Sequence, residues 1–297
     1  MAPIYIICRL TGIFPLSARR SKGNIIVTLR RNDYFYIVSY FLIYVSLSIY
    51  ATYNVFVDEE NYVIVPKVLV LSETLIVIIL MLTTMFFCFF FRRLLLDCAR
   101  LITDVDCTLQ RLKVWINYRA AMWSNLKVFG IMIVSVFARS IVMGSTLRVD
   151  VVQQFTLFLA TFIKSLSKYE FIAMLLPLSV RFNKINDEIV AYRVRRRDPS
   201  LPGDLYTLCR THFKLCNISR RLNICFAFQL LSSLAVSLTD ILFQGFYLYV
   251  IMTKKQRLAT PAMMASPVVW LIDECMEIYL LVNACSTTCQ AVRYVIF

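Results

Sequence analysis

The chain has 297 residues, of which 59% are hydrophobic and 17% are charged, and its formal net charge is +14. Soluble domains are about 45–50% apolar and about 25% charged, so this composition excludes most soluble enzymes and disordered chains. With one histidine in the chain, histidine metal sites and most Ser/His or Cys/His catalysis are disfavoured. We therefore expect an integral membrane protein with no enzymatic activity and no cofactor.

The N-terminal segment, residues 1–33, is basic and precedes the first long apolar block. Its apolar start is short and is interrupted by Arg9, which disfavours a signal peptide. We expect this segment to lie in the cytosol or at the membrane interface.

Six long apolar segments follow and predict an all-α, polytopic membrane protein with its transmembrane domain over residues 34–290. An apolar helix needs about 20 residues to cross the hydrocarbon core, and each of these segments is long enough. The fourth holds the most charges along its length and has the least certain limits. The predicted spans are 34–57, 68–91, 126–147, 150–180, 222–252 and 261–290.

The lysines and arginines predict that both termini face the cytosol. They lie between the apolar blocks rather than on one face, which argues against nucleic acid and for anionic lipid as the surface partner. With an inside N-terminus, 23 of the 32 basic residues fall in inner segments and five in outer ones. The inner segments are then 1–33, 92–125, 181–221 and 291–297, and the outer ones are 58–67, 148–150 and 253–260.

The longest inner segment, 181–221, predicts a cytosolic helical hairpin. Apolar positions at helical spacing run from Arg181 to Arg195 and again from Tyr206 to Arg221. The proline- and glycine-containing stretch 198–204 separates them as a breaker. The fourth and fifth membrane helices are thus expected to extend below the membrane.

Charged side chains inside the predicted spans are the candidate functional residues. An acid at the bilayer centre costs about 2.5–3.5 kcal/mol on insertion scales, so it faces the protein interior or water. Asp273 and Glu277 are four residues apart and share a helix face, whereas Glu274 is expected to point elsewhere. We interpret six residues as the border of an outward-facing cavity for a polar or cationic ligand: Glu73, Arg139, Asp240, Trp270, Asp273 and Glu277.

A purely structural role is the alternative for these residues. Arg139 would then pair with one acid while the other acids reach toward the interface. Trp270 would belong to the aromatic belt at the membrane surface.

Three stretches of the chain resemble the insect gustatory receptor family, which is related to the odorant receptors. They lie at the start of the chain, around the start of the fifth span, and along the sixth span. The residues are Tyr5 to Pro15; His212 to Cys216, Leu222, Asn223 and Phe228 to Leu231; and Asp273 to Leu281 with Ala284 to Gln290.

This resemblance implies a taste receptor of the plasma membrane that binds a small-molecule tastant and acts as a ligand-gated cation channel. Family members are implied to be homo- or hetero-tetramers with seven helices and an inside N-terminus. The ligand pocket would lie among the outer halves of helices two to six, and helix seven would line the pore. A G-protein-coupled receptor has its N-terminus outside the cell, and the distribution of basic residues argues against that class.

The tail, residues 291–297, departs from the family because the Thr-Tyr signature of helix seven is not found there. The expectation from this difference is a truncated, non-conducting form. The alternative function is a six-helix membrane transporter whose intramembrane charges line a substrate path. The identity of the ligand stays open.

Overall fold

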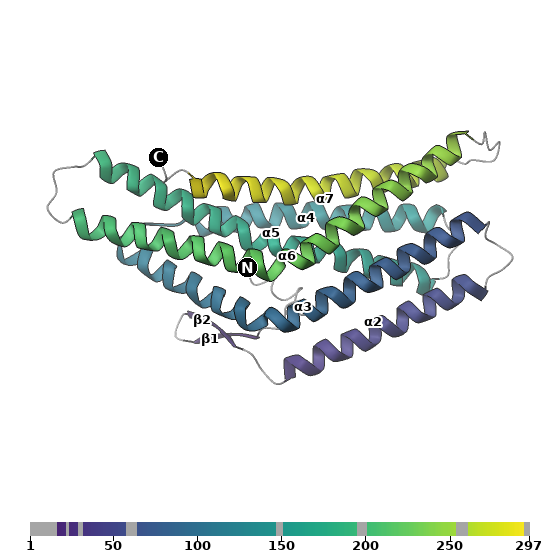
Figure 1. The fold of residues 1–297 in the computed structure, drawn as a ribbon, viewed down its shortest axis with the longest axis horizontal. Coiled ribbons are helices and arrows are strands. Elements are labelled where there is room, and N and C mark those ends of the chain that lie inside the picture. The colour runs from purple at the N-terminus through teal and green to yellow at the C-terminus, as the bar shows by residue number, and fades with distance from the viewer. Residues whose placement is uncertain are drawn as a thin grey trace.

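The computed structural model describes residues 17–21, 24–28, 32–57, 64–146, 151–194, 201–253 and 261–293. Nearly all of this part of the chain is helical, as the sequence predicts (Figure 1). The helices are α2 (Asn32–Val57), α3 (Ile64–Arg111), α4 (Tyr118–Thr146), α5 (Val151–Val194), α6 (Leu201–Thr253) and α7 (Pro261–Arg293).

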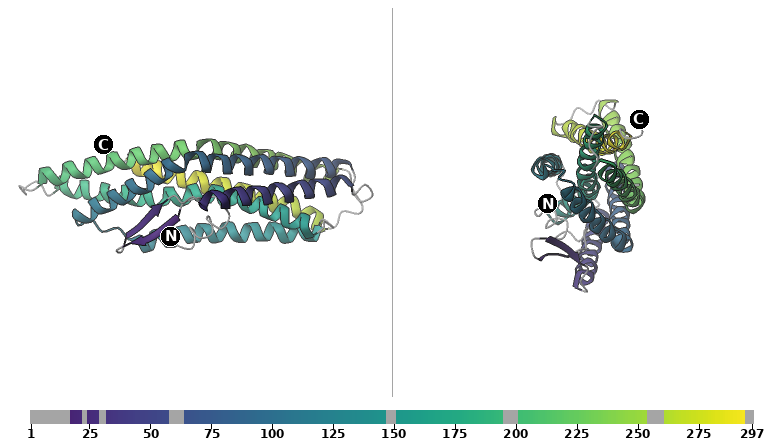
Figure 2. Two further views of the ribbon diagram at one scale, coloured as in Figure 1. Left: turned by 90° about the horizontal axis from the view of Figure 1, so that it is seen from below. Right: turned by 90° about the vertical axis from the view of Figure 1, so that its left-hand side faces the viewer.

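The six helices form one elongated bundle in which successive helices run in opposite directions (Figures 1 and 2). The last residues of α2, α4 and α6 and the first residues of α3, α5 and α7 lie at one end of the bundle, and the opposite ends of these helices lie at the other. Each helix contains one of the six predicted spans. Successive helix ends thus alternate between the two ends of the bundle, as the predicted alternation of inner and outer segments requires.

A short β-hairpin precedes the bundle, and the sequence analysis did not predict it. Strands β1 (Ser17–Ser21) and β2 (Asn24–Thr28) pair antiparallel, with Ser21 opposite Asn24. The signal was a run of β-branched residues after a two-residue connection that contains glycine. We had interpreted the basic residues here only as a topology signal.

Two helical stretches of the described residues, 118–142 in α4 and 203–253 in α6, are long and apolar enough by themselves to cross a membrane. A third candidate is α3, which bends by 59° near Arg92. In α5 and α7, ionisable residues interrupt the apolar runs, at Lys164, Lys168 and Glu170 and at 273–277. The interior of the bundle must therefore supply partners for these charged side chains.

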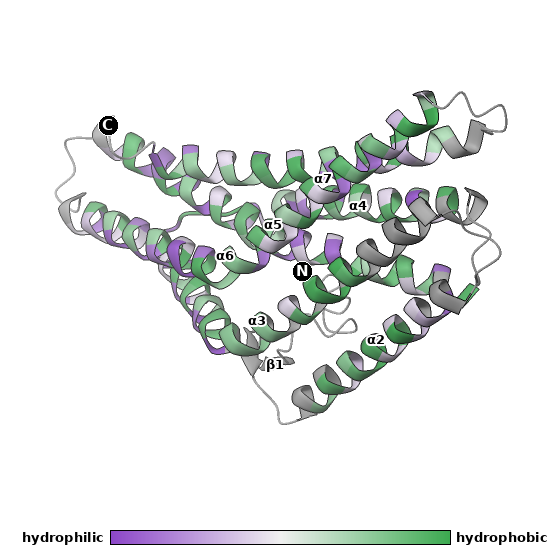
Figure 3. Ribbon diagram, turned by 45° about the vertical axis from the view of Figure 1, so that its right-hand side comes forward, coloured by the Kyte–Doolittle hydropathy of each residue, from purple (hydrophilic) through white to green (hydrophobic). Residues whose placement is uncertain are grey.

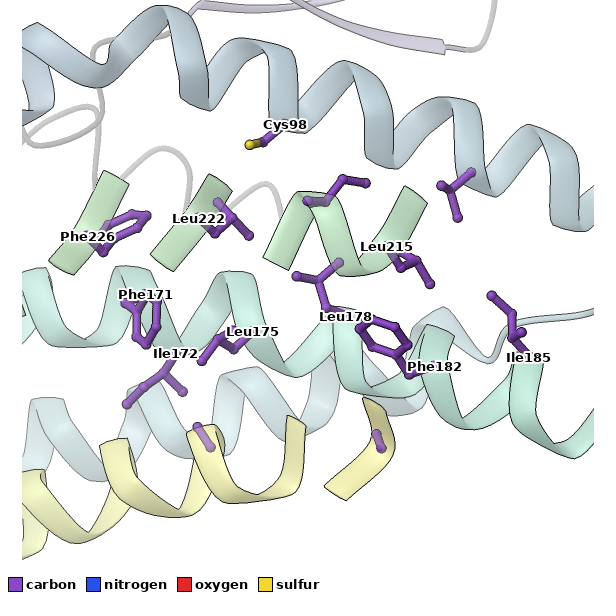
Figure 4. Packing of buried hydrophobic residues seen from close by; sticks show 14 of the residues in the cluster. Cys98, Phe171, Ile172, Leu175, Leu178, Phe182, Ile185, Leu215, Leu222 and Phe226 are labelled. Atoms are coloured by element: carbon purple, nitrogen blue, oxygen red, sulfur yellow. The ribbon is translucent and has the colours of Figure 1, made fainter. Parts of the chain in front are cut away.

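The main apolar core involves the C-terminal half of α5 and the N-terminal half of α6, and Figure 4 shows the packing of its side chains. It is built from α3, α5, α6 and α7, and its side chains interdigitate in one continuous cluster. Leu178 and Phe182 of α5 and Leu215 of α6 are fully buried in it. This packing fixes α5 and α6 against α3 well beyond the length needed to span a bilayer.

Helices α5 and α6 continue through most of segment 181–221. Helix α6 begins at Leu201 rather than at the expected Tyr206, so Pro202 lies in its first turn. Proline is tolerated there because the first backbone N–H groups of a helix have no partner inside the helix. The last four residues of the predicted breaker, 201–204, are therefore helical, and its first three, 198–200, lie outside the described residues.

Two ion pairs tie the extension to α3. Arg181 Nε and Nη2 donate to Asp106 Oδ1 and Oδ2, each at 2.7 Å, and the arginine side chain is nearly buried. Lys214 Nζ lies 2.7 Å from Asp104 Oδ2, but both of these side chains are exposed. The first pair is therefore the stronger contact, because solvent screens the second.

We expect the stability of this extension to fall below about pH 6.5 because of His212. The ring is buried against Phe182 and Cys216, and its Nε2 atom has no hydrogen-bond partner among the described residues. Burial lowers the pKa of His212 from its usual 6.5. The unfolded chain thus binds the proton more readily than the folded chain, so the free energy of unfolding decreases as the pH drops.

The measurement is the thermal midpoint of the purified protein between pH 7.5 and 5.5. His212→Asn removes the titrating group from a chain with one histidine, so the difference in slope between the two proteins isolates its effect. That difference cannot exceed about 1.4 kcal/mol per pH unit for one proton. Parallel pH profiles for the two proteins would contradict the assignment.

Candidate functional site

Hydrophilic residues interrupt the otherwise apolar helices of the bundle (Figure 3), and many of them are buried. Seven of them are ionisable, come from four helices, and have side chains that are at most 5% exposed. We name this group the charge cluster. It consists of Arg139 on α4, Lys164 and Lys168 on α5, Asp240 on α6, and Asp273, Glu274 and Glu277 on α7.

Glu274 is the centre of the charge cluster because three cations surround its carboxylate. Its Oε1 atom lies 3.0 Å from Arg139 Nη1 and 2.6 Å from Lys164 Nζ. Its Oε2 atom lies 3.7 Å from Lys168 Nζ. One acid on α7 thereby holds both α4 and α5.

The two lysines of α5 also reach a second acid each. Lys164 Nζ lies 2.5 Å from Asp240 Oδ2 on α6. Lys168 Nζ lies 2.5 Å from Glu277 Oε2 on α7 and donates a 2.7 Å hydrogen bond to Ser237 Oγ on α6. These contacts make α5 the central helix of the cluster.

Arg139 and Asp273 form the edge of the cluster. Arg139 Nη1 lies 3.4 Å from Asp273 Oδ2, and its guanidinium carbon lies 3.2 Å from the centre of the Trp270 ring. A cation over a tryptophan face gains about 0.5–2 kcal/mol, more where water is excluded. Ser135 of α4 donates to the other oxygen of Asp273.

Five of the six predicted site residues come together in this way: Arg139, Asp240, Trp270, Asp273 and Glu277. Glu73 belongs to α3, but its side chain lies outside the described residues. Trp270 is buried under Arg139, so a place in the interfacial aromatic belt does not describe it.

The expected orientation of Glu274 is wrong. Its position next to Asp273 in the sequence suggests that it points away from that face. Glu274 is, however, three residues from Glu277, and residues at this spacing are neighbours on the surface of a helix. Its carboxylate turns inward because α4 and α5 together present three cations to it. A count of helix positions on α7 alone could not supply this information.

Lys164 and Lys168 were not among the predicted site residues. In the sequence analysis, these lysines count only among the charges of the fourth predicted span. The signal was present, because these lysines are four residues apart, the same spacing as Asp273 and Glu277. Two ladders of opposite charge at equal spacing on two helices are expected to pair.

The charge balance of the cluster shows why the helices cannot separate easily. Three cations meet four carboxylates, and removing one partner from such a buried group costs about 3–5 kcal/mol. A further carboxyl group, that of Glu170 on α5, is buried nearby in sequence and has no described hydrogen-bond partner. The ion pairs of the cluster thus hold α4, α5, α6 and α7 together inside an apolar bundle.

A small pocket lies between α4 and α5, next to the charge cluster. Its described lining is apolar and partly aromatic, and Ser165 is its link to the cluster because the serine hydroxyl donates to Glu277 Oε1. Tyr169 donates its hydroxyl to the Asn125 carbonyl oxygen at 3.2 Å. The lining residues are Phe129, Met132, Ile133, Val136, Phe162, Ser165, Leu166 and Tyr169.

Comparison with protein families gives one match, and it covers almost the whole chain. A family model described as "7tm Chemosensory receptor" matches residues 1–295. Among curated protein sequences, none matches this chain. The matched range includes the pocket and every residue of the charge cluster.

Proposed function

Because the chain belongs to the seven-transmembrane chemosensory receptor family, we propose that it is a taste receptor that detects a small-molecule tastant at the plasma membrane. By its resemblance to the insect gustatory receptors, the signal is a cation current through a ligand-gated channel of which this chain is a subunit. The family membership supports the coarser statement, a chemosensory receptor role in a membrane.

The observation that supports a ligand site here is the contact between a pocket and the charge cluster. The pocket lies between α4 and α5, and Ser165 joins it to Glu277 on α7. Ligand sites in proteins are mostly apolar concavities with a few placed polar groups. The pocket shares this composition, but its volume of about 10 Å³ is far below that of such sites, so a ligand would occupy a wider cavity beside it. We propose that Glu73, Arg139, Asp240, Trp270, Asp273 and Glu277 border the wider ligand cavity.

Assembly with other subunits, as a homo- or hetero-tetramer, is proposed for the α5–α6 extension. Tyr206 and Phe213 of α6 are 69% and 77% exposed there, well away from the predicted membrane span. Large apolar side chains exposed to water mark interaction surfaces. Anionic lipid is the proposed partner of the basic residues at the inner membrane surface.

The six-helix transporter remains the alternative because buried intramembrane charges are typical of substrate paths. Transporter helices are often broken near the substrate site, and Pro177 in the fourth span is the residue that could break this helix. Helix α5 runs without interruption from Val151 to Val194, with Pro177 inside it. The receptor function is therefore the better supported of the two.

The test is calcium entry into cells that co-express the chain with an intact member of the family and are exposed to a panel of tastants, because the chain by itself is expected not to conduct. Asp273→Asn and Glu277→Gln each remove one negative charge from the cluster, and we expect a shift of about tenfold or more in the effective concentration of an active tastant. Asp187→Asn is the matched control, because that acid is exposed and its ion pair with Lys184 is long, at 3.7 Å.

Surface biotinylation of each variant separates a changed response from lost protein. Unchanged dose–response curves with normal surface levels would remove these residues from the ligand site. Tastant-driven uptake of a labelled compound without calcium entry would favour the transporter.

A further inference from the structure

The turn between α3 and α4 presents a tryptophan to the surface at the predicted inner end of the bundle. Trp115 is 80% exposed there, and Tyr118 and Trp123, which follow it on α4, are about half exposed. The third tryptophan of the chain, Trp270, is by contrast buried under Arg139. Large apolar side chains grouped at the surface in this way mark an interaction surface.

The turn has a defined geometry, so the exposure of Trp115 is set by the fold. The backbone N–H of Lys113 donates to the carbonyl oxygen of Gln110 at 3.1 Å. The N–H of Val114 donates to the carbonyl oxygen of Leu109 at 2.9 Å, and both of these residues are buried in the main apolar core. These two bonds form a Schellman motif, which ends α3 and turns the next side chain outward.

The same turn is strongly basic. Arg111, Lys113 and Arg119 are exposed around Trp115, and residues 107–149 contain no acid. Lys113 has a φ of 59°, a left-handed conformation that costs an L-residue free energy and for which glycine is the usual choice at a helix end. A lysine in a glycine position indicates that its positive charge has a use.

The length of α4 places the turn in the headgroup layer of the membrane. The apolar stretch of α4, Tyr118 to Val142, has 25 residues and is therefore about 38 Å long. This length lies between the hydrocarbon core of about 30 Å and the whole bilayer of about 40–45 Å. Exposed apolar side chains recur from Ile141 down to Tyr118, so the lipid-facing surface of α4 reaches the turn.

We propose that the α3–α4 turn binds the headgroups of anionic phospholipids in the inner leaflet. Trp115 lies among the headgroups, and Arg111, Lys113 and Arg119 contact their negative charges. Tryptophan favours this layer, and each lysine or arginine beside an anionic surface adds to the attraction. The inference rests on the membrane location and the anionic lipid proposed above, to which it assigns a site, and it does not depend on taste reception.

A protein partner fits the turn less well than a lipid does. Tyr118 packs under Arg181 of α5, whose guanidinium carbon lies 5.7 Å from the centre of the ring. Helix α5 continues from there to Val194, about 20 Å farther along its axis. The turn therefore lies at the membrane end of the α5–α6 extension and not at its tip, where another subunit has more surface to contact.

The experiment measures the fluorescence of Trp115 in nanodiscs of phosphatidylcholine with increasing fractions of phosphatidylserine. Subtracting the spectrum of Trp115→Phe from that of the unchanged protein isolates this side chain, and Trp123→Phe isolates Trp123 in the same way. We expect Trp115 emission to move to shorter wavelength as phosphatidylserine rises, and to be quenched by a lipid that carries a doxyl group near its headgroup. Trp123 lies farther along α4, so its emission is expected to be the same with and without phosphatidylserine.

Lys113→Gln tests the charge. It is expected to raise the phosphatidylserine fraction at the midpoint of the shift by about fivefold, the change that corresponds to one basic residue beside an anionic surface. Lys113→Arg is expected to keep the original midpoint. Lys184→Gln removes an exposed lysine from α5 and is the matched control, for which no change is expected.

Trp115 emission that ignores phosphatidylserine, or a midpoint that Lys113→Gln and Lys184→Gln shift equally, would overturn the proposal. Emission that depends on protein concentration in detergent, and not on lipid, would assign the turn to a protein partner and overturn it as well. The readout needs no tastant. A receptor without a tastant response whose Trp115 still responds to phosphatidylserine would therefore reject the proposed function and support the lipid site.

Discussion

Glu274→Gln is expected to destabilise the protein by about 3–5 kcal/mol, whereas Asp273→Asn one residue away is expected to cost about 1 kcal/mol or less. Glu274 lies within 3.0 Å of both Arg139 and Lys164, so its loss leaves buried cations without their shared partner. Asp273 lies 3.4 Å from Arg139, and an asparagine can still accept the hydrogen bond from Ser135.

This pair of variants distinguishes direct pairing from overall charge balance. Both substitutions remove one negative charge from a cluster with three cations and four acids, so an effect of net charge alone would make them equal. The measurement is the thermal midpoint in detergent, together with the fraction of protein that reaches the cell surface. Equal midpoints for the two variants would show that the position of the acid is unimportant.

Asp106→Asn is expected to cost about 2–3 kcal/mol, while Asp104→Asn on the same helix is expected to cost less than about 1 kcal/mol. Asp106 takes two hydrogen bonds from Arg181, whose side chain is only 6% exposed. The expected loss of stability is smaller than that for a fully buried ion pair, because the Asp106 side chain is itself 26% exposed. Asp104 pairs with Lys214 at the same 2.7 Å, but in solvent.

Proteolysis of the α5–α6 extension measures this effect locally. Losing Asp106 leaves the buried Arg181 guanidinium with the Pro177 carbonyl oxygen as its remaining described acceptor, so the extension opens more often. We expect faster cleavage between residues 181 and 221 in Asp106→Asn and an unchanged rate in Asp104→Asn. Equal rates in both variants would mean that distance, and not burial, determines the value of an ion pair here.

The helices could be predicted from the sequence because their signal is carried by each segment alone. Long apolar runs define α2 to α7, and the basic residues between them alternate as the antiparallel bundle requires. The β-hairpin was missed because five-residue strands give a weak pattern inside a segment interpreted by its charge. The early start of α6 was missed because proline was interpreted as a breaker rather than as a first-turn residue.

The site could be predicted only in part, because its geometry depends on which helices are neighbours. The cost of burying a charge singled out Arg139, Asp240, Asp273 and Glu277, which the structure brings together. The orientation of Glu274 depends on cations from α4 and α5, and a sequence pattern on α7 holds no information about them. Ser165 was missed for the same reason, since an uncharged serine in an apolar helix gives no signal by itself.

The order of the charges along the chain bears on how the protein is made. Arg139, Lys164 and Lys168 are synthesised before any of their partners on α6 and α7. A cation at the centre of a helix that enters the bilayer alone costs about 2.5–3.5 kcal/mol, so α5 is a poor membrane segment at the moment it leaves the ribosome. It becomes a good one only when α6 and α7 arrive with their acids. Stable insertion of α5 is therefore expected to depend on the synthesis of α6 and α7.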